Sequence, residues 1–161
     1  MNIIIQKGTK ADLPQVYNLI QELAEYEKAP QEVTNTLADM EADGFGEQPI
    51  FEFFVAEAEG KVIGICLYYT AYSTWKGRML FLEDLVVTEA YRRYGVGKNL
   101  FDAFARRAQE LGAKRLKWQV LDWNEPAIAF YKKLKANLDA EWINCNMSEA
   151  EIAAYVNQIK D

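Results

Sequence analysis

Two adjacent carboxylates, Glu83 and Asp84, stand inside an apolar run over residues 79–87. The run predicts a β-strand, on which neighbouring side chains point to opposite faces. At least one carboxylate is then expected to leave bulk solvent or line a cleft, where carboxylates usually need a partner. The pair is a candidate for proton transfer or for binding a cation. A surface pair or a capped strand end is the alternative.

The chain contains no histidine. This excludes Ser–His–Asp catalysis, histidine-ligated zinc or iron, and an imidazole general base. A carboxylate with a raised pKa, or a water chain, is then the natural base.

A second candidate site is the segment 91–98, Tyr-Arg-Arg-Tyr-Gly-Val-Gly-Lys, which leads from the predicted strand into a helix. The backbone N–H groups of such a turn, together with the helix N-terminus, favour a bound anion. Gly95 and Gly97 lack the Cβ atoms that would keep a pyrophosphate away, while Arg92 and Lys98 add positive charge. The segment matches neither a Walker A loop nor a dinucleotide fingerprint. A tight strand-to-helix turn is the alternative.

Two aromatic residues are further candidates. Tyr131 follows Asn124, a predicted helix cap, on a short helix predicted over 126–133. Its phenol is a possible proton donor, although aromatic residues at this spacing usually belong to a core. Trp75 lies in a turn and either stacks on an aliphatic cation or anchors the turn.

Composition bounds the class of protein. The 161 residues are 50% hydrophobic with a net charge of −6, so one domain over residues 1–161 can bury a core. No basic stripe is present, and nucleic acid is not an expected partner. Cys66 and Cys145 are far apart, which favours free, buried thiols in a reducing compartment. The longest apolar stretch, residues 62–69, is too short for a membrane span, and we expect a soluble, cytoplasmic protein.

Hydrophobic periodicity predicts alternating elements. Strands are expected at 3–5, 51–56, 61–69, 79–87 and 116–121, with a late strand at 142–145. Helices are expected at about 13–26, 37–44, 97–111, 126–133 and 148–158, and Gly112 is a C′ residue that ends the third of them. The expected strands form hairpins in the first part of the chain and alternate with helices in the later part. This order predicts an α/β (α+β) fold with a mixed, mostly antiparallel central sheet flanked by helices.

The R-x-x-G-x-G string at 92–97 resembles the coenzyme A pyrophosphate loop of the GCN5-related N-acetyltransferases (GNAT). Further strings narrow the resemblance to the diamine acetyltransferase family and occur in that family's order: residues 23–27, 43–49, 82–84, 91–92, 123–126 and 130–132. Residues 72–78 and 120–124 look most like its thialysine N-epsilon-acetyltransferase branch. The polyamine-acetylating branch has an Asp at the position of Ser73. Related chains usually have a glycine near Lys135.

The resemblance implies a GNAT fold, acetyl-CoA as cosubstrate, no metal, and direct attack of a small amine on the thioester in a homodimer. It implies that Glu83 helps to take the proton of the amine, directly or through water, that Asp84 helps to bind the cation, and that Tyr131 protonates the departing thiolate. An N–H group near Val86 is expected to hold the reacting oxygen. Cofactor-binding residues are then Leu85, Val86, Val87, Arg92, Arg93, Tyr94, Gly95, Val96, Gly97, Lys98, Asn124 and Tyr131. Substrate-binding residues are Glu27, Trp75, Glu83 and Asp84, with a solvated helix end as the alternative for Glu27.

The expected substrate is thialysine or a related lysine-like or diamine compound, with no nucleic acid or membrane as a partner. One alternative is acetylation of spermidine or spermine. Another is a catalytically degenerate acyl-CoA-binding module that regulates a partner.

Overall fold

A computed structural model describes residues 1–160, which form two compact units, one from Met1 to Gln119 and one that begins at Val120. The first unit contains β1 (Ile3–Lys7), α1 (Leu13–Tyr26), α2 (Leu37–Phe45), β2 (Glu52–Ala58), β3 (Lys61–Ser73), β4 (Gly77–Val87), α3 (Val96–Glu110) and β5 (Arg115–Trp118). The second contains α4 (Glu125–Lys133) and α5 (Glu149–Val156). None of the helices in residues 1–160 is long and apolar enough to cross a membrane.

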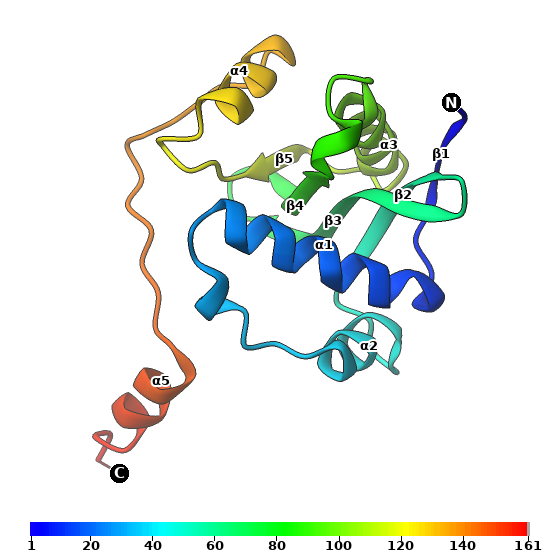
Figure 1. Ribbon diagram of the computed structural model, residues 1–161. Coiled ribbons are helices and arrows are strands. Elements are labelled where there is room, and N and C mark those ends of the chain that lie inside the picture. Colours follow the sequence, from blue (N-terminus) through cyan, green and yellow to red (C-terminus); the bar gives the residue numbers. More distant parts are fainter. Residues whose placement is uncertain (161) are drawn as a thin grey trace. The chain divides into compact units, whose positions relative to one another are not determined.

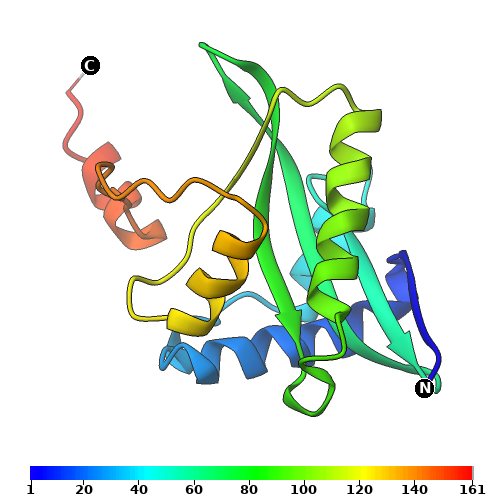
Figure 2. The same cartoon turned by 90° about the horizontal axis from the view of Figure 1, so that it is seen from above.

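The five strands form one sheet in the order β1-β2-β3-β4-β5, with antiparallel pairs except for the parallel pair of β4 and β5. Helices α1 and α2 lie on one side of the sheet and α3 on the other (Figures 1 and 2). On the first side, Leu13 and Val16 of α1 and Met40 of α2 pack in the core with the inward side chains of the strands. The predicted mixed, mostly antiparallel sheet is confirmed.

A β-bulge interrupts the pairing of β3 and β4. Leu67 pairs with Asp84, whereas the next residue, Tyr68, pairs with Leu82. Glu83 is therefore an extra residue on β4 with no partner of its own in the ladder with β3.

The bulge changes which face each part of β4 presents. In a regular strand residues 82, 84 and 86 would share one face. Instead Leu82 lies opposite Tyr68, whose ring contacts Phe104 of α3. Val86 belongs to the core cluster beneath α1. Even-numbered side chains of β4 therefore pack on the α3 side before the bulge and on the α1 side after it, because the extra residue reverses the alternation of faces along the strand.

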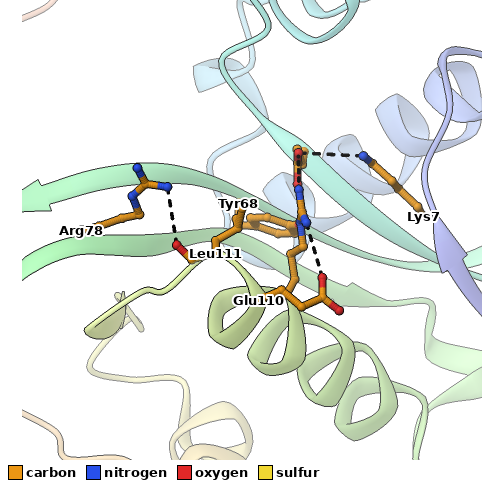
Figure 3. Close-up of polar contacts among 7 residues, drawn as sticks. Lys7, Tyr68, Arg78, Glu110 and Leu111 are labelled. Carbon is orange, nitrogen blue, oxygen red and sulfur yellow. Dashed lines mark hydrogen bonds and ion pairs between the residues drawn. The ribbon is translucent and has the colours of Figure 1, made fainter.

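A polar network fixes α3 to the other face of the sheet. The Arg107 guanidinium donates to both carboxylate oxygens of Glu52 at 3.1 and 3.2 Å, and the Tyr68 hydroxyl donates to the same carboxylate at 3.0 Å. Lys7 and Glu110 flank the pair (Figure 3). The hydrogen bonds from Arg107 lower the pKa of Glu52, so the carboxylate stays charged and the network stays closed at neutral pH.

Three local predictions are corrected. Residues 142–145 are not a strand, because a strand needs a neighbouring strand for its backbone groups and the described part of the second unit contains no strand. The strand predicted over 116–121 is shorter and ends at Trp118. Cys66 is buried as predicted, but Cys145 is exposed because it lies in this irregular segment.

Helices α3 and α4 end with the same backbone geometry, as α1 also does, but with different residues. After α3, Gly112 has φ +70° and the Ala113 N–H donates to the Ala108 carbonyl at 2.9 Å, which confirms the predicted helix end. After α4, Lys135 has φ +62° and the next N–H donates back to the Tyr131 carbonyl at 3.1 Å. Lys135 therefore occupies a left-handed position that favours glycine, and there it costs about 1–2 kcal/mol.

We expect Lys135→Gly to raise the free energy of unfolding by about 1 kcal/mol, since relief of the left-handed strain exceeds the extra chain entropy of glycine. Gly112→Ala is the matched reverse change. A Cβ atom at Gly112 would meet nothing within 4 Å, so its expected loss of about 1 kcal/mol is purely a backbone effect. Thermal and urea unfolding followed by circular dichroism measure both, and a destabilised Lys135→Gly variant would contradict the assignment.

Candidate active site

The bulge places Asp84 on the α1 side of the sheet. Asp84 lies opposite Leu67, a member of the core beneath α1, and is itself partly buried. Burial raises the pKa of Asp84 to about 7, and the negative charges of Glu83 and Glu27 raise it further in the same direction. Near neutral pH this carboxyl is poised between its neutral and ionised forms.

Glu83 lies on the same side of the sheet as Asp84. Tyr69 follows Leu67 by two residues on β3 and so shares its face. Burial first, and then the Glu83 carboxylate, raise the pKa of the Tyr69 phenol, so the two side chains lie on the same side of the sheet. The expectation that Glu83 and Asp84 point to opposite faces is therefore wrong. It assumed a regular strand, whereas a bulge inserts one residue and brings two consecutive side chains to one side.

Glu27 completes an acidic cluster with Glu83 and Asp84. It is the C-cap residue of α1, is partly buried, and has a pKa raised by that burial. In the described residues, no salt bridge neutralises any member of the cluster, and no group of acidic or cysteine side chains is arranged to hold a metal ion. Uncompensated carboxylates at one place favour an organic cation as ligand.

The edge of β4 next to this acidic cluster is open. The pairing of β4 with β5 covers Met79 to Leu82 and ends at the pair of Leu82 and Trp118. Beyond it, Leu85, Val86 and Val87 pair with β3 on one side only, as far as the described strands go. Apart from the Val87 carbonyl, which accepts a hydrogen bond from Arg92, their outward backbone groups are available to an extended ligand that carries amide groups.

The loop after β4 is held at both ends. The Thr88 N–H donates to the Ile63 carbonyl at 2.9 Å, and the Arg92 Nε donates to the Val87 carbonyl at 2.9 Å. The Arg92 guanidinium also lies 5.5 Å from the ring centroid of Tyr26, at the end of α1. Arg92 thus ties the loop to β4 and α1 in addition to bringing positive charge.

The N-terminus of α3 is left uncapped by side chains. Gly95 is the N-cap residue with φ +77°, and the first turn contains no acidic residue. By contrast, Thr36 and Ser148 cap α2 and α5 with their hydroxyl groups. The first N–H groups of α3 therefore remain available to an anion. Lys98 beside them forms an ion pair with Asp102 at 2.7 Å.

Asn124 and Tyr131 belong to the second unit. The Asn124 side chain accepts a hydrogen bond from the Ala127 N–H at 3.3 Å, which confirms it as the cap of α4. Tyr131 lies on α4 with its ring edge-to-face against that of Phe130, at a centroid distance of 5.4 Å. The proposed chemical roles of both residues stay predictions.

Trp75 lies at the tip of the hairpin of β3 and β4, where its side chain is 89% exposed. The Ser73 hydroxyl closes this turn by accepting from the Trp75 and Lys76 N–H groups at 3.3 and 3.1 Å, so the indole does not anchor it. The β4 residues from Gly77 to Glu83 separate the tip from the acidic cluster by roughly 20 Å. The structure does not bring Trp75 to the acidic cluster of its own chain.

Sequence reasoning missed one residue of this region, Tyr69. Its place beside Glu83 depends on the bulge, which changes the face to which the side chains of β4 point. The hydrophobic pattern of the sequence does not indicate where this bulge lies. A search for polar groups on the neighbouring strand would find it only once the register of the two strands is known.

Comparison with known proteins decides the family. The model of the acetyltransferase (GNAT) family matches residues 13–135. The chain is 40% identical to the thialysine N-epsilon-acetyltransferase of Bos taurus over 159 residues, which cover 92% of this chain and 94% of that protein. It is 36% identical to the Caenorhabditis elegans protein of the same name, over 98% of this chain and 99% of the other. The chain belongs to the GNAT family.

Solved GNAT structures have the same fold. An aminoglycoside N-acetyltransferase in complex with CoA matches with a TM-score of 0.73 and 20% identity, covering 91% of this chain and 95% of that one. The resemblance to N-acetyltransferases inferred from the R-x-x-G-x-G string is thus confirmed, and the protein is an N-acetyltransferase of this family. In this GNAT chain, the string runs from the Arg92 anchor to the uncapped start of α3.

The raised pKa of Asp84 predicts a pH-dependent effect of Asp84→Asn. Between about pH 4, where an unfolded Asp ionises, and about pH 7, the folded wild type holds the proton more tightly, so its stability falls as pH rises through this window. The Asn variant lacks this loss. Its gain in free energy of unfolding is expected to grow from pH 4 to pH 7 and level off above.

Urea unfolding at pH 5, 6 and 8 measures the gain, with Asp43→Asn at an exposed position as the control. A gain that is equal at pH 5 and pH 8 would show that Asp84 titrates normally.

Proposed function

We propose that this protein transfers the acetyl group of acetyl-CoA to the primary amine of thialysine or of a related lysine-like or diamine compound. The observation that carries the proposal is the acidic cluster, three carboxylates without a cationic partner in the described residues, beside the open edge of β4. A protonated amine supplies the missing charge. The names of the relatives that match over more than nine-tenths of this chain point to the same class of substrate.

The residues that would hold acetyl-CoA are those whose backbone groups have no partner within the described secondary structure. The backbone N–H groups from Gly95 to Lys98, at the uncapped start of α3, suit the pyrophosphate, with Arg93 and Tyr94 in the same loop. The open edge at Leu85, Val86 and Val87 suits an extended chain with amides, and a backbone N–H group near Val86 is suited to hold the reacting oxygen. When bound, the thioester supplies the acetyl group.

The acidic cluster has two tasks in this proposal. Asp84 and Glu27 bind the ammonium group, whose positive charge favours the ionised form of Asp84. Glu83 then accepts a proton from the amine, directly or through water, which frees the nitrogen lone pair for attack on the thioester. Tyr131 donates a proton to the departing thiolate, and Asn124 contacts the cofactor.

We further propose that the protein is a cytoplasmic homodimer. A role for Trp75 in binding the amine requires a second copy, because roughly 20 Å of β4 separates the hairpin tip from the acidic cluster of the same chain. In a dimer, the exposed indole of one subunit could stack on the aliphatic part of a substrate that the other subunit holds.

The cofactor site predicts unequal effects of two neighbouring substitutions. Gly97→Val places bulk where the backbone must approach pyrophosphate, and we expect it to abolish acetyl-CoA binding. Valine is no worse than glycine in a helix, so folding should survive. Lys98→Ala should weaken binding only modestly, since this ammonium group already pairs with Asp102. Calorimetric titration measures both, and full affinity in Gly97→Val would refute the proposed phosphate site.

The substrate prediction is a higher kcat/KM for thialysine than for spermidine. A polyamine carries several charges and gains from carboxylates spread along its length, and a hydrogen bond to a charged group contributes about 1.5–3 kcal/mol. Ser73 is neutral and lies in the same hairpin turn as Trp75, so its effect on the amine requires the proposed dimer. There we expect a roughly ten- to hundredfold penalty for spermidine, and Ser73→Asp should shift the ratio toward it.

The matched control is Ser73→Asn, which can also close the turn by accepting backbone N–H groups but adds no charge. Steady-state assays with both amines at one pH decide the question. A wild-type preference for spermidine would favour a polyamine acetyltransferase, and acetyl-CoA binding without turnover of any amine would favour a regulatory acyl-CoA-binding module.

A further inference from the structure

We propose that Tyr69 is a positioning residue that holds the Glu83 carboxylate in the orientation needed for proton transfer. The inference rests on the proposed role of Glu83 as the group that accepts a proton from the amine. It adds a residue of β3 to a site otherwise built from α1, β4 and the loop that follows β4.

The geometry of the two strands places the phenol beside the bulge. Tyr69 pairs with Phe81 across the ladder, and their rings stack at a centroid distance of 5.3 Å with an interplanar angle of 24°. Glu83 follows Phe81 by two residues on β4, which is a diagonal position that long aromatic side chains reach. Stacking on Phe81 therefore fixes the direction in which the Tyr69 hydroxyl points.

Glu83 needs such a partner. It is the extra residue of the bulge, and its side chain is exposed. Without a fixed donor, a glutamate side chain on a surface samples many rotamers, and only a few of them face the amine. From its diagonal position on β3, the Tyr69 phenol is placed to donate a hydrogen bond to this carboxylate and so to select among those rotamers.

The phenol is suited to remain a donor at the pH of the reaction. Burial first, and then the charge of Glu83, raise the pKa of Tyr69 above its usual value. The proton therefore stays on the phenol oxygen while the carboxylate remains the acceptor. Tyr69 does not exchange a proton with the substrate in this role.

The adjacent tyrosine provides a matched control. Tyr68 also donates its hydroxyl to a carboxylate, that of Glu52, at 3.0 Å, but on the opposite face of the same strand. There the carboxylate binds Arg107 of α3, in the network that Figure 3 draws. Tyr68→Phe and Tyr69→Phe thus remove the same kind of bond from two faces, and only the second bond involves Glu83.

The first test is kinetic. In Tyr69→Phe the ring still stacks on Phe81, so we expect a folded protein with an unchanged KM for acetyl-CoA and a kcat about tenfold lower. The loss should appear in kcat and not in the KM for acetyl-CoA, because a misdirected carboxylate slows proton transfer without changing the cofactor site. Tyr68→Phe should leave kcat in place, even where it lowers the melting temperature. An unchanged kcat in Tyr69→Phe would overturn the proposal.

A double mutant separates positioning from a merely structural role. In the Glu83→Gln background, Tyr69→Phe should cause little further loss of kcat, because the carboxylate that it orients is already gone. An equal tenfold loss in both backgrounds would overturn the link between the two residues while leaving the proposed acetyltransferase activity intact.

A third measurement does not depend on activity. The ring carbon of Tyr69, followed by NMR, should report a lower pKa in Glu83→Gln than in the wild type, whereas Glu27→Gln should have little effect on it. An unchanged pKa of Tyr69 in Glu83→Gln would refute the contact itself. Wild-type protein that acetylates no amine, but shows the expected pKa change, would refute the proposed function and keep the pairing of Tyr69 with Glu83.

Discussion

The β-bulge at Glu83 is the constraint on which the site depends. One extra residue in β4 lets Leu82 pair opposite Tyr68 near α3 while Val86 packs beneath α1. The same extra residue brings Glu83 and Asp84 to one side of the sheet. The single strand β4 therefore contributes side chains to the hydrophobic cores on both faces of the sheet and to the acidic cluster. Removal of the bulge would disturb all three at once.

The electrostatics of the site follow from this crowding. Glu27, Glu83 and Asp84 come from two elements that the core beneath α1 holds together, and no cation of the described residues neutralises them. Elsewhere in the same unit, Glu52 is matched by Arg107 and stays fully charged. The carboxylate of the structural network is thus paired, whereas those at the bulge are not. This contrast supports the proposal that the acidic cluster binds a cationic ligand.

The loop and the acidic cluster share the end of α1. Arg92 of the loop lies against Tyr26, and Glu27, the next residue, acts electrostatically on Asp84. The loop suited to pyrophosphate and the acidic cluster suited to an amine therefore both contact the C-terminal end of α1. The position of one relative to the other is then set by packing of α1 on the sheet, as direct transfer between two bound substrates requires.

The sequence determined the features that depend on neighbouring residues. The helix ending at Tyr26, the glycine end of α3 at Gly112 and the Asn124 cap follow from local patterns, and the structure confirms them. The mostly antiparallel sheet and the GNAT family could also be inferred from the order of elements and from the string at 92–97. The catalytic and binding roles of the individual residues, and the single domain over residues 1–161, stay predictions.

Only the tertiary structure decided how the carboxylates are arranged. Local alternation assigned Glu83 and Asp84 to opposite faces, because the position of a bulge depends on the register with β3 and not on the sequence of β4 alone. The same register brings Tyr69 to Glu83, and the fold leaves Trp75 at a distant hairpin tip. These outcomes are long-range pairings, whose free energies come from contacts between segments that are far apart along the chain.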